Sequence, residues 1–189
     1  MPRTTLNKQD LQRRTPESGG PGAATAPSPL GQQCGDDPVC VALGPQDLEA
    51  CLALDQLSLG GFWNREQWRQ ELESPQRPAV GLRRGEALLA VACAWLVLDE
   101  LHITLVAVHP EQRRRGLGHL VLQRLLERGG ALGATRATLE VATTNSAACH
   151  LYSRCGFRTA GIRRDYYRNG DDALIQWLTL SSQGLRGDP

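Results

Sequence analysis

The stretch VAVHPEQRRRGLG, residues 106–118, predicts a strand that passes through a tight turn into a helix. The strand must end at Pro110, which has no N–H group to donate to a sheet. Gly116 and Gly118 let the backbone turn closely, and the next N–H groups converge at a helix N-terminus, where the helix dipole favours an anion. The arginines at 113–115 add positive charge. The stretch therefore predicts a binding site for a diphosphate group.

Two common phosphate-binding motifs do not fit this turn. A Walker loop requires a lysine directly after its second glycine, and the only lysine of the chain is Lys8. The dinucleotide-binding fingerprint requires a third small residue at the position of Val121. These mismatches argue against a kinase, a P-loop enzyme and a nicotinamide-dependent enzyme. An ordinary surface loop remains the alternative for the turn taken alone.

The sequence on both sides of the turn alternates between short apolar runs and helical patterns. The apolar runs predict strands at residues 39–43, 79–83, 87–98, 101–108, 137–141, 157–166 and 173–180. Helices are predicted at residues 45–57, 64–73 and 116–132, and a fourth helix is capped by Asn145 and ends near residue 154, before Gly156. Tight turns are expected at Asp99-Glu100, between antiparallel strands, and at Asn169-Gly170. The pattern indicates an α/β (α+β) fold in which helices flank a mixed sheet.

Three segments differ in composition. Residues 1–38 are rich in Pro, Gly, Ser, Thr, Ala and Gln and contain no aromatic residue. Such a segment cannot bury enough apolar surface to order itself, so we expect a disordered N-terminal tail. Residues 39–180 have the size and apolar content of one globular domain. Residues 181–189 are expected to form a flexible C-terminal tail.

The overall composition argues against several classes of partner. The formal net charge is only +1, so no global field draws the chain to nucleic acid or to anionic lipid. The arginines of the N-terminal tail leave RNA binding open as an alternative for that segment. No apolar run approaches the roughly 18 to 20 residues of a membrane helix, and no secretory signal is visible. We expect a soluble, cytoplasmic protein that acts as a monomer.

The cysteines and histidines show no pattern typical of a metal site. The six cysteines form no C-x-x-C pair, which favours reduced thiols. The four histidines lack helical ligand spacing with a carboxylate or thiolate partner; they are His102, His109, His119 and His150. No metal is therefore predicted.

The pattern Arg113-x-x-Gly116-x-Gly118 after a strand resembles the acetyl-CoA signature of the GNAT superfamily of N-acetyltransferases. Residues 139–148, 151–157 and 162–167 are similar to the bacterial branch that acetylates the N-terminal alanine of a small-subunit ribosomal protein. The resemblance covers residues 39–180. It implies the GNAT fold, which is a mixed, mostly antiparallel sheet of about six to seven strands with flanking helices and a splayed central strand.

The resemblance also implies roles for individual residues. Main-chain groups of Val106, Ala107 and Val108 would hold the pantetheine arm of acetyl-CoA, and Asn145 would contact it from the next helix. The pyrophosphate would be wrapped by Arg114, Arg115, Gly116, Leu117, Gly118 and His119. Glu140 would act as general base, and Tyr152 would give a proton to the leaving thiol. The chain departs from the branch at His119, where arginine is common, and at Phe62-Trp63, which lacks the proline that commonly lies between such aromatics.

The chemistry of acetyl transfer suits these residue types. An amine attacks a thioester only when it is neutral, and a terminal amine, with a pKa near ~8, loses its proton more easily than a lysine near ~10.4. Glu140 can accept that proton directly or through a water. Pairing with one of the many arginines is the structural alternative for Glu140.

Tyr152 follows Asn145 by seven residues, about two helical turns, so both side chains can project from one helix face. A phenol near pKa ~10 is a weaker acid than a thiol near ~8.5, which makes hydrogen bonding to the leaving group its main expected contribution. A packed aromatic is the alternative for Tyr152. The candidates for a peptide groove are Phe62, Trp63, Tyr166 and Tyr167, and core packing would explain them equally well.

Three other functions remain open at this point. A GNAT enzyme can acetylate a small-molecule amine instead of a ribosomal protein, and peptide and small-amine substrates would separate these cases. A non-catalytic acyl-CoA sensor would keep the glycine turn and lose turnover, but Glu140 and Tyr152 argue against it. RNA binding by the tail predicts retention that is sensitive to salt and is lost with the tail.

Overall fold

The computed structural model describes residues 37–180. The predicted N-terminal tail lies outside this range except for its last two residues, and the predicted C-terminal tail at 181–189 lies wholly outside it. Within the described part, strands and helices follow one another in the predicted order.

The described chain contains seven strands, four α-helices and two short 3-10 helices. The strands are β1 (Val39–Ala42), β2 (Ala79–Arg84), β3 (Ala87–Val97), β4 (Glu100–Val108), β5 (Arg136–Ala142), β6 (Arg158–Arg163) and β7 (Ala173–Thr179). The helices are η2 (Pro45–Asp47), α1 (Leu48–Leu59), α2 (Arg65–Glu73), η3 (Pro110–Gln112), α3 (Leu117–Ala131) and α4 (Ser146–Arg154). Every predicted strand and helix is confirmed; η3 was not predicted.

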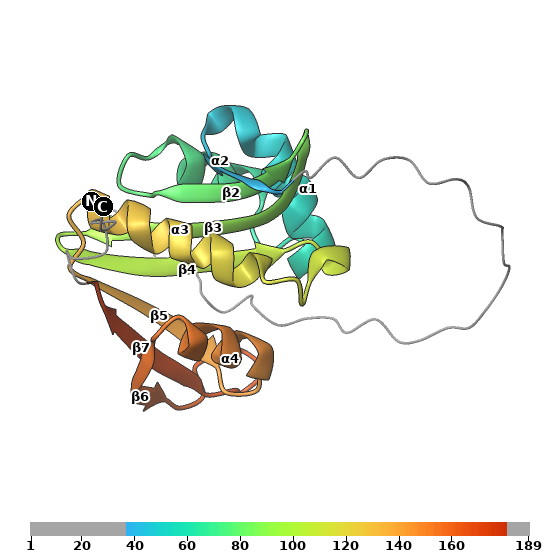
Figure 1. The fold of residues 1–189 in the computed structure, drawn as a ribbon. Helices are drawn as coiled ribbons and strands as arrows, with labels where there is room; N and C mark the ends of the chain where they lie inside the picture. The colour runs from blue at the N-terminus through green and yellow to red at the C-terminus, as the bar shows by residue number, and fades with distance from the viewer. Residues whose placement is uncertain (1–36, 181–189) are drawn as a thin grey trace, which may run out of the picture.

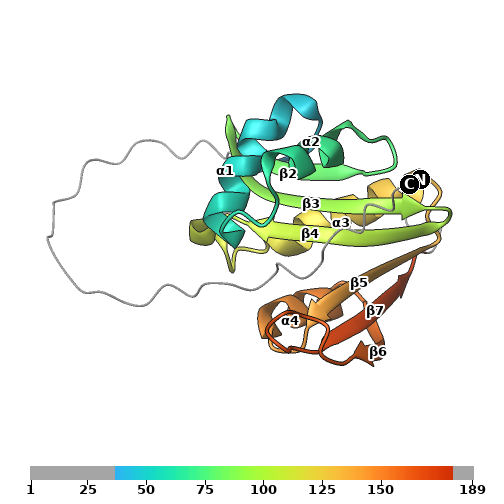
Figure 2. The same ribbon diagram turned by 180° about the vertical axis from the view of Figure 1, so that it is seen from behind.

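The strands form one sheet in the order β1-β2-β3-β4-β5-β7-β6. The pair β4 and β5 is parallel, and all the other neighbouring pairs are antiparallel. The predicted mixed, mostly antiparallel sheet is therefore confirmed. α3 connects β4 to β5 and lies on one face, while α1 and α2 lie on the opposite face (Figures 1 and 2).

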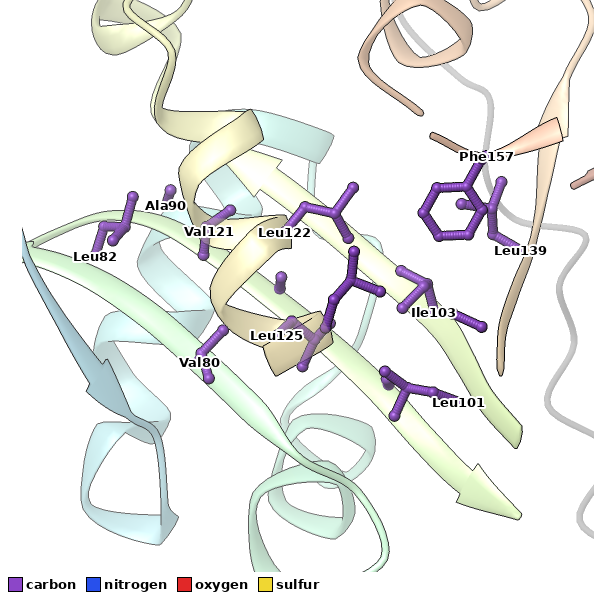
Figure 3. Close-up of a cluster of buried hydrophobic side chains, with 14 of the residues drawn as sticks. Val80, Leu82, Ala90, Leu101, Ile103, Val121, Leu122, Leu125, Leu139 and Phe157 are labelled. Atoms are coloured by element: carbon purple, nitrogen blue, oxygen red, sulfur yellow. The ribbon is translucent and has the colours of Figure 1, made fainter. Parts of the chain in front are cut away.

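Each face of the sheet packs its own hydrophobic core. Val121, Leu122 and Leu125 of α3 point toward apolar side chains of β2, β3 and β4, as Figure 3 shows. On the opposite face, Trp68 of α2 is fully buried beside Val91 of β3 and residues of α1. The near-continuous apolar sequence of β3 follows from this, because both faces of a strand covered on two sides must be apolar.

A β-bulge at Thr104 changes which face the side chains of β4 occupy. Ile103 pairs with Ala94, and Leu105 pairs with the adjacent Cys93, so Thr104 is an extra residue on β4. Ile103 belongs to the core under α3, and Leu105 belongs to the core under α1 and α2. Without the bulge, the two side chains would point to the same face.

The parallel pair β4 and β5 is joined only at its beginning. Register partners are Glu100 with Arg136, Leu101 with Ala137 and His102 with Thr138. Beyond these three pairs the strands diverge, and β5, β6, β7 and α4 form a second group beside the rest of the sheet (Figure 1). The expected splayed central strand is therefore present, and it leaves one edge of β4 without a strand partner from Ile103 onward.

The structure corrects two predicted turns. The turn between β3 and β4 is formed by Leu98 and Asp99, and Glu100 already belongs to β4. Leu98 adopts a left-handed φ of 57° there, which a sequence pattern does not predict for leucine because this conformation disfavours branched side chains. The strand predicted to reach Tyr166 ends at Arg163. The turn at Asn169-Gly170 is present, since the N–H of Gly170 donates to the carbonyl of Tyr167 at 2.9 Å, but it lies within a connection from Arg163 to Ala173 that is longer than a tight hairpin.

No helix within residues 37–180 is long and apolar enough to span a lipid bilayer.

Candidate active site

A pocket opens where β4 and β5 diverge. Its walls come from these two strands, from α4, from the end of α1 and the turn that follows it, and from the loop between β6 and β7. The residues that line it are Leu59, Phe62, Ile103, Thr104, Leu105, Val106, Leu139, Glu140, Val141, Ala142, Asn145, Ala148, Tyr152 and Tyr167. The structure thus brings together six residues that the sequence analysis singled out, which are Phe62, Val106, Glu140, Asn145, Tyr152 and Tyr167.

Glu140 projects from β5 into this pocket, and its side chain is only 15% exposed. The guanidinium Nη1 of Arg163, on β6, lies 3.4 Å from its Oε1. Arg163 also lies over the ring of Tyr166, 5.5 Å from its centroid. The predicted pairing of Glu140 with an arginine is present, and its role as general base stays a prediction that its place in the pocket permits.

Asn145 and Tyr152 lie on the same side of α4, as their spacing predicts, and both line the pocket. Asn145 is the N-cap of the helix, and its Oδ1 accepts from the N–H of Ala148 at 3.1 Å. The amide nitrogen Nδ2 of Asn145 can still donate to a ligand. The ring of Tyr152 packs edge-on against Phe157, with centroids 6.0 Å apart, and burial raises the pKa of its phenol. Tyr152 therefore enters the pocket as a neutral hydroxyl.

The free edge of β4 presents main-chain groups to the pocket side. His109 donates to the carbonyl of Leu89 on β3 at 2.8 Å. Hydrogen bonds alternate along an antiparallel strand, so Ala107 also faces β3 and the N–H groups of Val106 and Val108 face the gap. The N–H groups available to a ligand are therefore those of Val106 and Val108, rather than that of Ala107.

The glycine turn has the geometry of an anion site. Gly116 is the N-cap of α3 with a left-handed φ of 82°, and no side chain caps this helix end. The first N–H groups of α3 therefore have no intrahelical acceptor and point out of the helix. Arg114 also has a left-handed φ, of 61°, and both Arg114 and Arg115 are exposed beside these amides. His119 is half-buried in the first turn of α3.

Arg113 turns away from its two neighbours. Its Nη2 donates to the carbonyl of Ser58 at 3.0 Å and its Nε to the carbonyl of Val108 at 3.4 Å. The hydroxyl of Ser58 donates to the same Val108 carbonyl at 3.2 Å. The guanidinium of Arg113 thus joins the glycine turn to the end of α1, and its expected contribution of charge around a diphosphate stays a prediction.

The four candidate groove aromatics divide into two pairs. Phe62 and Tyr167 line the pocket. Trp63 is 5% exposed and belongs to the core under α1 and α2, where its ring meets that of Trp68. Tyr166 packs edge-on against Tyr167. Of the four aromatics, Phe62 and Tyr167 therefore lie where a peptide groove was predicted, and Trp63 and Tyr166 do not line the pocket.

The loop that carries Tyr167 is tied to the loop that carries Asn145. The N–H groups of Tyr166 and Tyr167 both donate to the carbonyl of Asp171 at 3.1 Å. The hydroxyl of Thr144 donates to the Asp171 carboxylate Oδ2 at 2.7 Å. Two walls of the pocket are therefore linked to each other.

Two residues near the pocket were not predicted from the sequence. Arg163 is one of several arginines after Gly156, and nothing in the pattern distinguishes the one that meets Glu140. Asp55 is buried in α1 with 1% exposure. The sequence does contain a signal for Asp55. It lies beside Cys51 and Leu54 on the side of α1 that faces the core, and an acidic residue is rarely buried there unless it has a partner.

Within residues 37–180, no group of three or more His, Cys, Asp or Glu side chains is arranged to hold a metal ion. Five cysteines in this range are free thiols: Cys40, Cys51, Cys93, Cys149 and Cys155.

Comparison with known proteins gives a consistent result. The sequence profile described as the acetyltransferase (GNAT) family matches residues 48–157. A ribosomal protein bS18-alanine N-acetyltransferase of Salmonella typhimurium is 38% identical over 142 residues, which are 74% of this chain and 95% of that protein. The crystal structure of the ribosomal-protein-S18-alanine N-acetyltransferase from Escherichia coli superimposes with a TM-score of 0.71 at 30% identity, covering 80% of this chain and 99% of that one.

A plant structure shares the fold at lower identity. Arabidopsis thaliana NAA60, solved in complex with acetyl-CoA, superimposes with a TM-score of 0.68 at 17% identity, covering 76% of this chain and 98% of that one.

Proposed function

Since the chain belongs to the acetyltransferase (GNAT) family, we propose that it transfers the acetyl group of acetyl-CoA to the N-terminal alanine amine of a small-subunit ribosomal protein. One observation carries this proposal: the divergence of β4 and β5 creates a pocket in which Glu140, Asn145 and Tyr152 meet the free edge of β4. The relatives named for the same reaction support the choice of acceptor.

Acetyl-CoA would bind along the free edge of β4 and end at the glycine turn. The N–H groups of Val106 and Val108 would hold the pantetheine arm as an added strand would be held. The diphosphate would accept hydrogen bonds from the main chain between residues 114 and 119, at the N-terminus of α3. Gly116 fits this role because its left-handed backbone directs these amides outward. Arg114 and Arg115 supply the neutralising charge.

The residues of the pocket can carry out the transfer. Glu140 accepts a proton from the terminal ammonium or from a water bonded to it, which leaves a neutral amine. The amine nitrogen forms a bond to the thioester carbon and releases its second proton to water. The carbon–sulfur bond then breaks, which leaves the amide and the thiolate of coenzyme A. A main-chain N–H on the free edge of β4 would stabilise the negative charge that develops on the carbonyl oxygen. Orientation of the two substrates on neighbouring strands supplies much of the acceleration.

Tyr152 would assist the leaving group. Because burial raises the pKa of its phenol, complete proton transfer to a thiolate is unfavourable. A neutral phenol instead donates a hydrogen bond to the departing sulfur, and the thiolate takes its proton afterwards from solvent. Arg163 would hold the Glu140 carboxylate in position within the pocket.

The experiment is a transfer assay with acetyl-CoA and an alanine-starting ribosomal peptide, followed by mass spectrometry. The proposal predicts one added acetyl group on the peptide and none on the same peptide with a blocked N-terminus. Small amines, including polyamines and free amino acids, serve as competing acceptors. Acetylation of small amines alone would contradict the ribosomal assignment.

A Glu140→Gln variant tests the chemical role. The amide cannot accept the proton, so we expect kcat to fall by about 10²-fold or more, with coenzyme A binding retained. An unchanged rate would remove Glu140 from the mechanism.

A further inference from the structure

Asp55 is a buried carboxylate whose hydrogen-bond donors come largely from a single turn. It lies in α1 and is 1% exposed. Its Oδ1 accepts from the N–H of Phe62 at 2.8 Å, and its Oδ2 accepts from the N–H of Trp63 at 2.9 Å and the indole Nε1 of Trp68 at 2.8 Å. A buried carboxylate is costly unless its oxygens are satisfied, and here uncharged donors satisfy them.

The backbone carbonyl of the same residue holds the start of that turn. The N–H of Gly60 donates to the Asp55 carbonyl, and the N–H of Gly61 lies 3.4 Å from the same oxygen. Both glycines have a left-handed φ, of 74° and 78°. Four successive amides, from Gly60 to Trp63, therefore converge on one residue. The amides of Gly60 and Gly61 bond the neutral carbonyl, and those of Phe62 and Trp63 bond the carboxylate, so both polar groups of Asp55 fix the turn.

This turn decides which of two successive aromatic rings faces the pocket. Phe62 lines the pocket that contains Glu140 and Tyr152. The ring of Trp63 goes to the core, where it meets Trp68 edge-on with centroids 4.9 Å apart. The two successive rings stack on each other, with centroids 5.8 Å apart. A small rotation of the turn would move Phe62 off the pocket wall.

We propose that Asp55 is a positioning residue for the amine acceptor, because its carboxylate fixes the turn that makes Phe62 a wall of the pocket. The inference rests on the proposed function and deepens it by assigning a residue to acceptor binding. Asp55 acts through Phe62, whereas the proposed acetyl-CoA contacts lie on other elements, the edge of β4 and the glycine turn. Its loss therefore affects the acceptor and spares the acetyl donor.

The variant Asp55→Asn separates these effects. An amide has a single accepting oxygen in place of two, and its NH2 group faces a donor in at least one of the three contacts. In kinetics with an alanine-starting peptide, we expect the peptide KM to rise about tenfold while the acetyl-CoA KM and kcat stay within about twofold. Phe62→Ala should produce the same pattern.

The double variant Asp55→Asn/Phe62→Ala is decisive. If Asp55 acts through Phe62, adding Asp55→Asn to Phe62→Ala changes the peptide KM by less than about twofold. Multiplication of the two single effects would overturn the proposal. If Asp55→Asn does not fold, Asp55→Glu, which keeps both oxygens, is measured in the same cycle with the same criterion.

Asp47→Asn is the matched control. Asp47 is also a buried aspartate beside α1, and it accepts from the N–H of Gly44 and from Arg83 Nη2, but it does not line the pocket. We expect this variant to lose stability with unchanged KM values for both substrates. An equal rise of the peptide KM in Asp47→Asn and Asp55→Asn would mean a general structural effect and would overturn the proposal.

Hydrogen exchange distinguishes this inference from the proposed function. We expect the amides of residues 60–63 to exchange at least about tenfold faster in Asp55→Asn than in the wild type or in Asp47→Asn. Wild-type protein that acetylates no peptide would contradict the proposed function, and the exchange rates would then decide whether Asp55 fixes the turn. Unchanged exchange would overturn the positioning role.

Discussion

The guanidinium of Arg113 donates to the carbonyl oxygen of Ser58, 3.0 Å away, and so joins the glycine turn to the last turn of α1. The same side chain reaches the Val108 carbonyl at the end of β4. The glycine turn, the end of β4 and the end of α1 therefore meet at one arginine. Arg113 therefore has a structural role within a sequence signature whose other residues are assigned to anion binding.

Replacing Arg113 with glutamine should loosen the glycine turn. The loss of hydrogen bonds from a charged donor at an exposed site corresponds to about 1 kcal/mol, so we expect the acetyl-CoA KM to rise about five- to tenfold. Steady-state kinetics against acetyl-CoA measure this. Arg128→Gln, at the other end of α3, is the control and should leave the KM unchanged. Equal KM values for acetyl-CoA in Arg113→Gln and Arg128→Gln would contradict the structural role of Arg113.

Gly116→Ala tests the backbone of the anion site. At a φ of 82° a side chain costs about 1–2 kcal/mol, and relief of that strain would redirect the amides that face the diphosphate. We expect lower thermal stability and weaker coenzyme A binding. The matched control is Gly133→Ala, which has a φ of 100° and, like Gly116, open space around it. It should lose similar stability and keep its affinity; equal losses of affinity would show that the turn has no special role.

Tyr152→Phe tests the hydrogen bond to the leaving group. The ring keeps its packing against Phe157, so stability should not fall. We expect kcat to drop by about 10²-fold with both KM values retained. Single-turnover kinetics would isolate the chemical step, and a wild-type rate in that experiment would leave Tyr152 as a packed aromatic only.

Glu71 predicts a specific pH dependence of stability. This glutamate of α2 is 1% exposed and accepts from Trp95 Nε1, Thr104 Oγ1 and Arg77 Nη1. Burial raises its pKa above the ordinary value of 4.5, although these hydrogen bonds oppose the shift. The folded state then holds the proton to higher pH than the unfolded state does. This contribution is fully present below pH 4.5 and is lost as pH rises through the raised pKa.

Glu71→Gln should remove that decline. Urea unfolding between about pH 4 and pH 7 measures the free energy of unfolding for both proteins. We expect the wild type to lose stability relative to Glu71→Gln as pH rises. The exposed Glu73 on the same helix provides the control variant Glu73→Gln. Parallel curves for the wild type and Glu71→Gln would contradict the shift.

The sequence predicted most of the fold because local signals agreed with tertiary ones. Apolar runs predicted all seven strands. Helix α4 begins after Asn145 and ends before Gly156, as the capping preferences of these two residues indicate. The membership in the GNAT family and the resemblance to the ribosomal-protein-alanine branch are confirmed. The features that the sequence predicted correctly are those that depend on the residues of a single segment, such as a strand, a helix cap or a motif.

The remaining features depend on contacts between distant segments. The bulge at Thr104 is a matter of register between β3 and β4, which alternation within one strand does not show. The pairing of Arg163 with Glu140 joins two strands separated by α4. Asp55 meets its donors only because the chain folds back after α1. The spacing of residues in the sequence does not predict any of these contacts.

The most direct test of the account is isothermal titration calorimetry of the protein with coenzyme A. If the amides around Gly116 hold the diphosphate and the edge of β4 holds the pantetheine arm, coenzyme A binds to one site per chain, and Glu140→Gln leaves that binding intact. Pantetheine, which lacks the diphosphate, should bind far more weakly. Absence of coenzyme A binding by the folded wild-type protein, or equal affinity for pantetheine, would contradict the account.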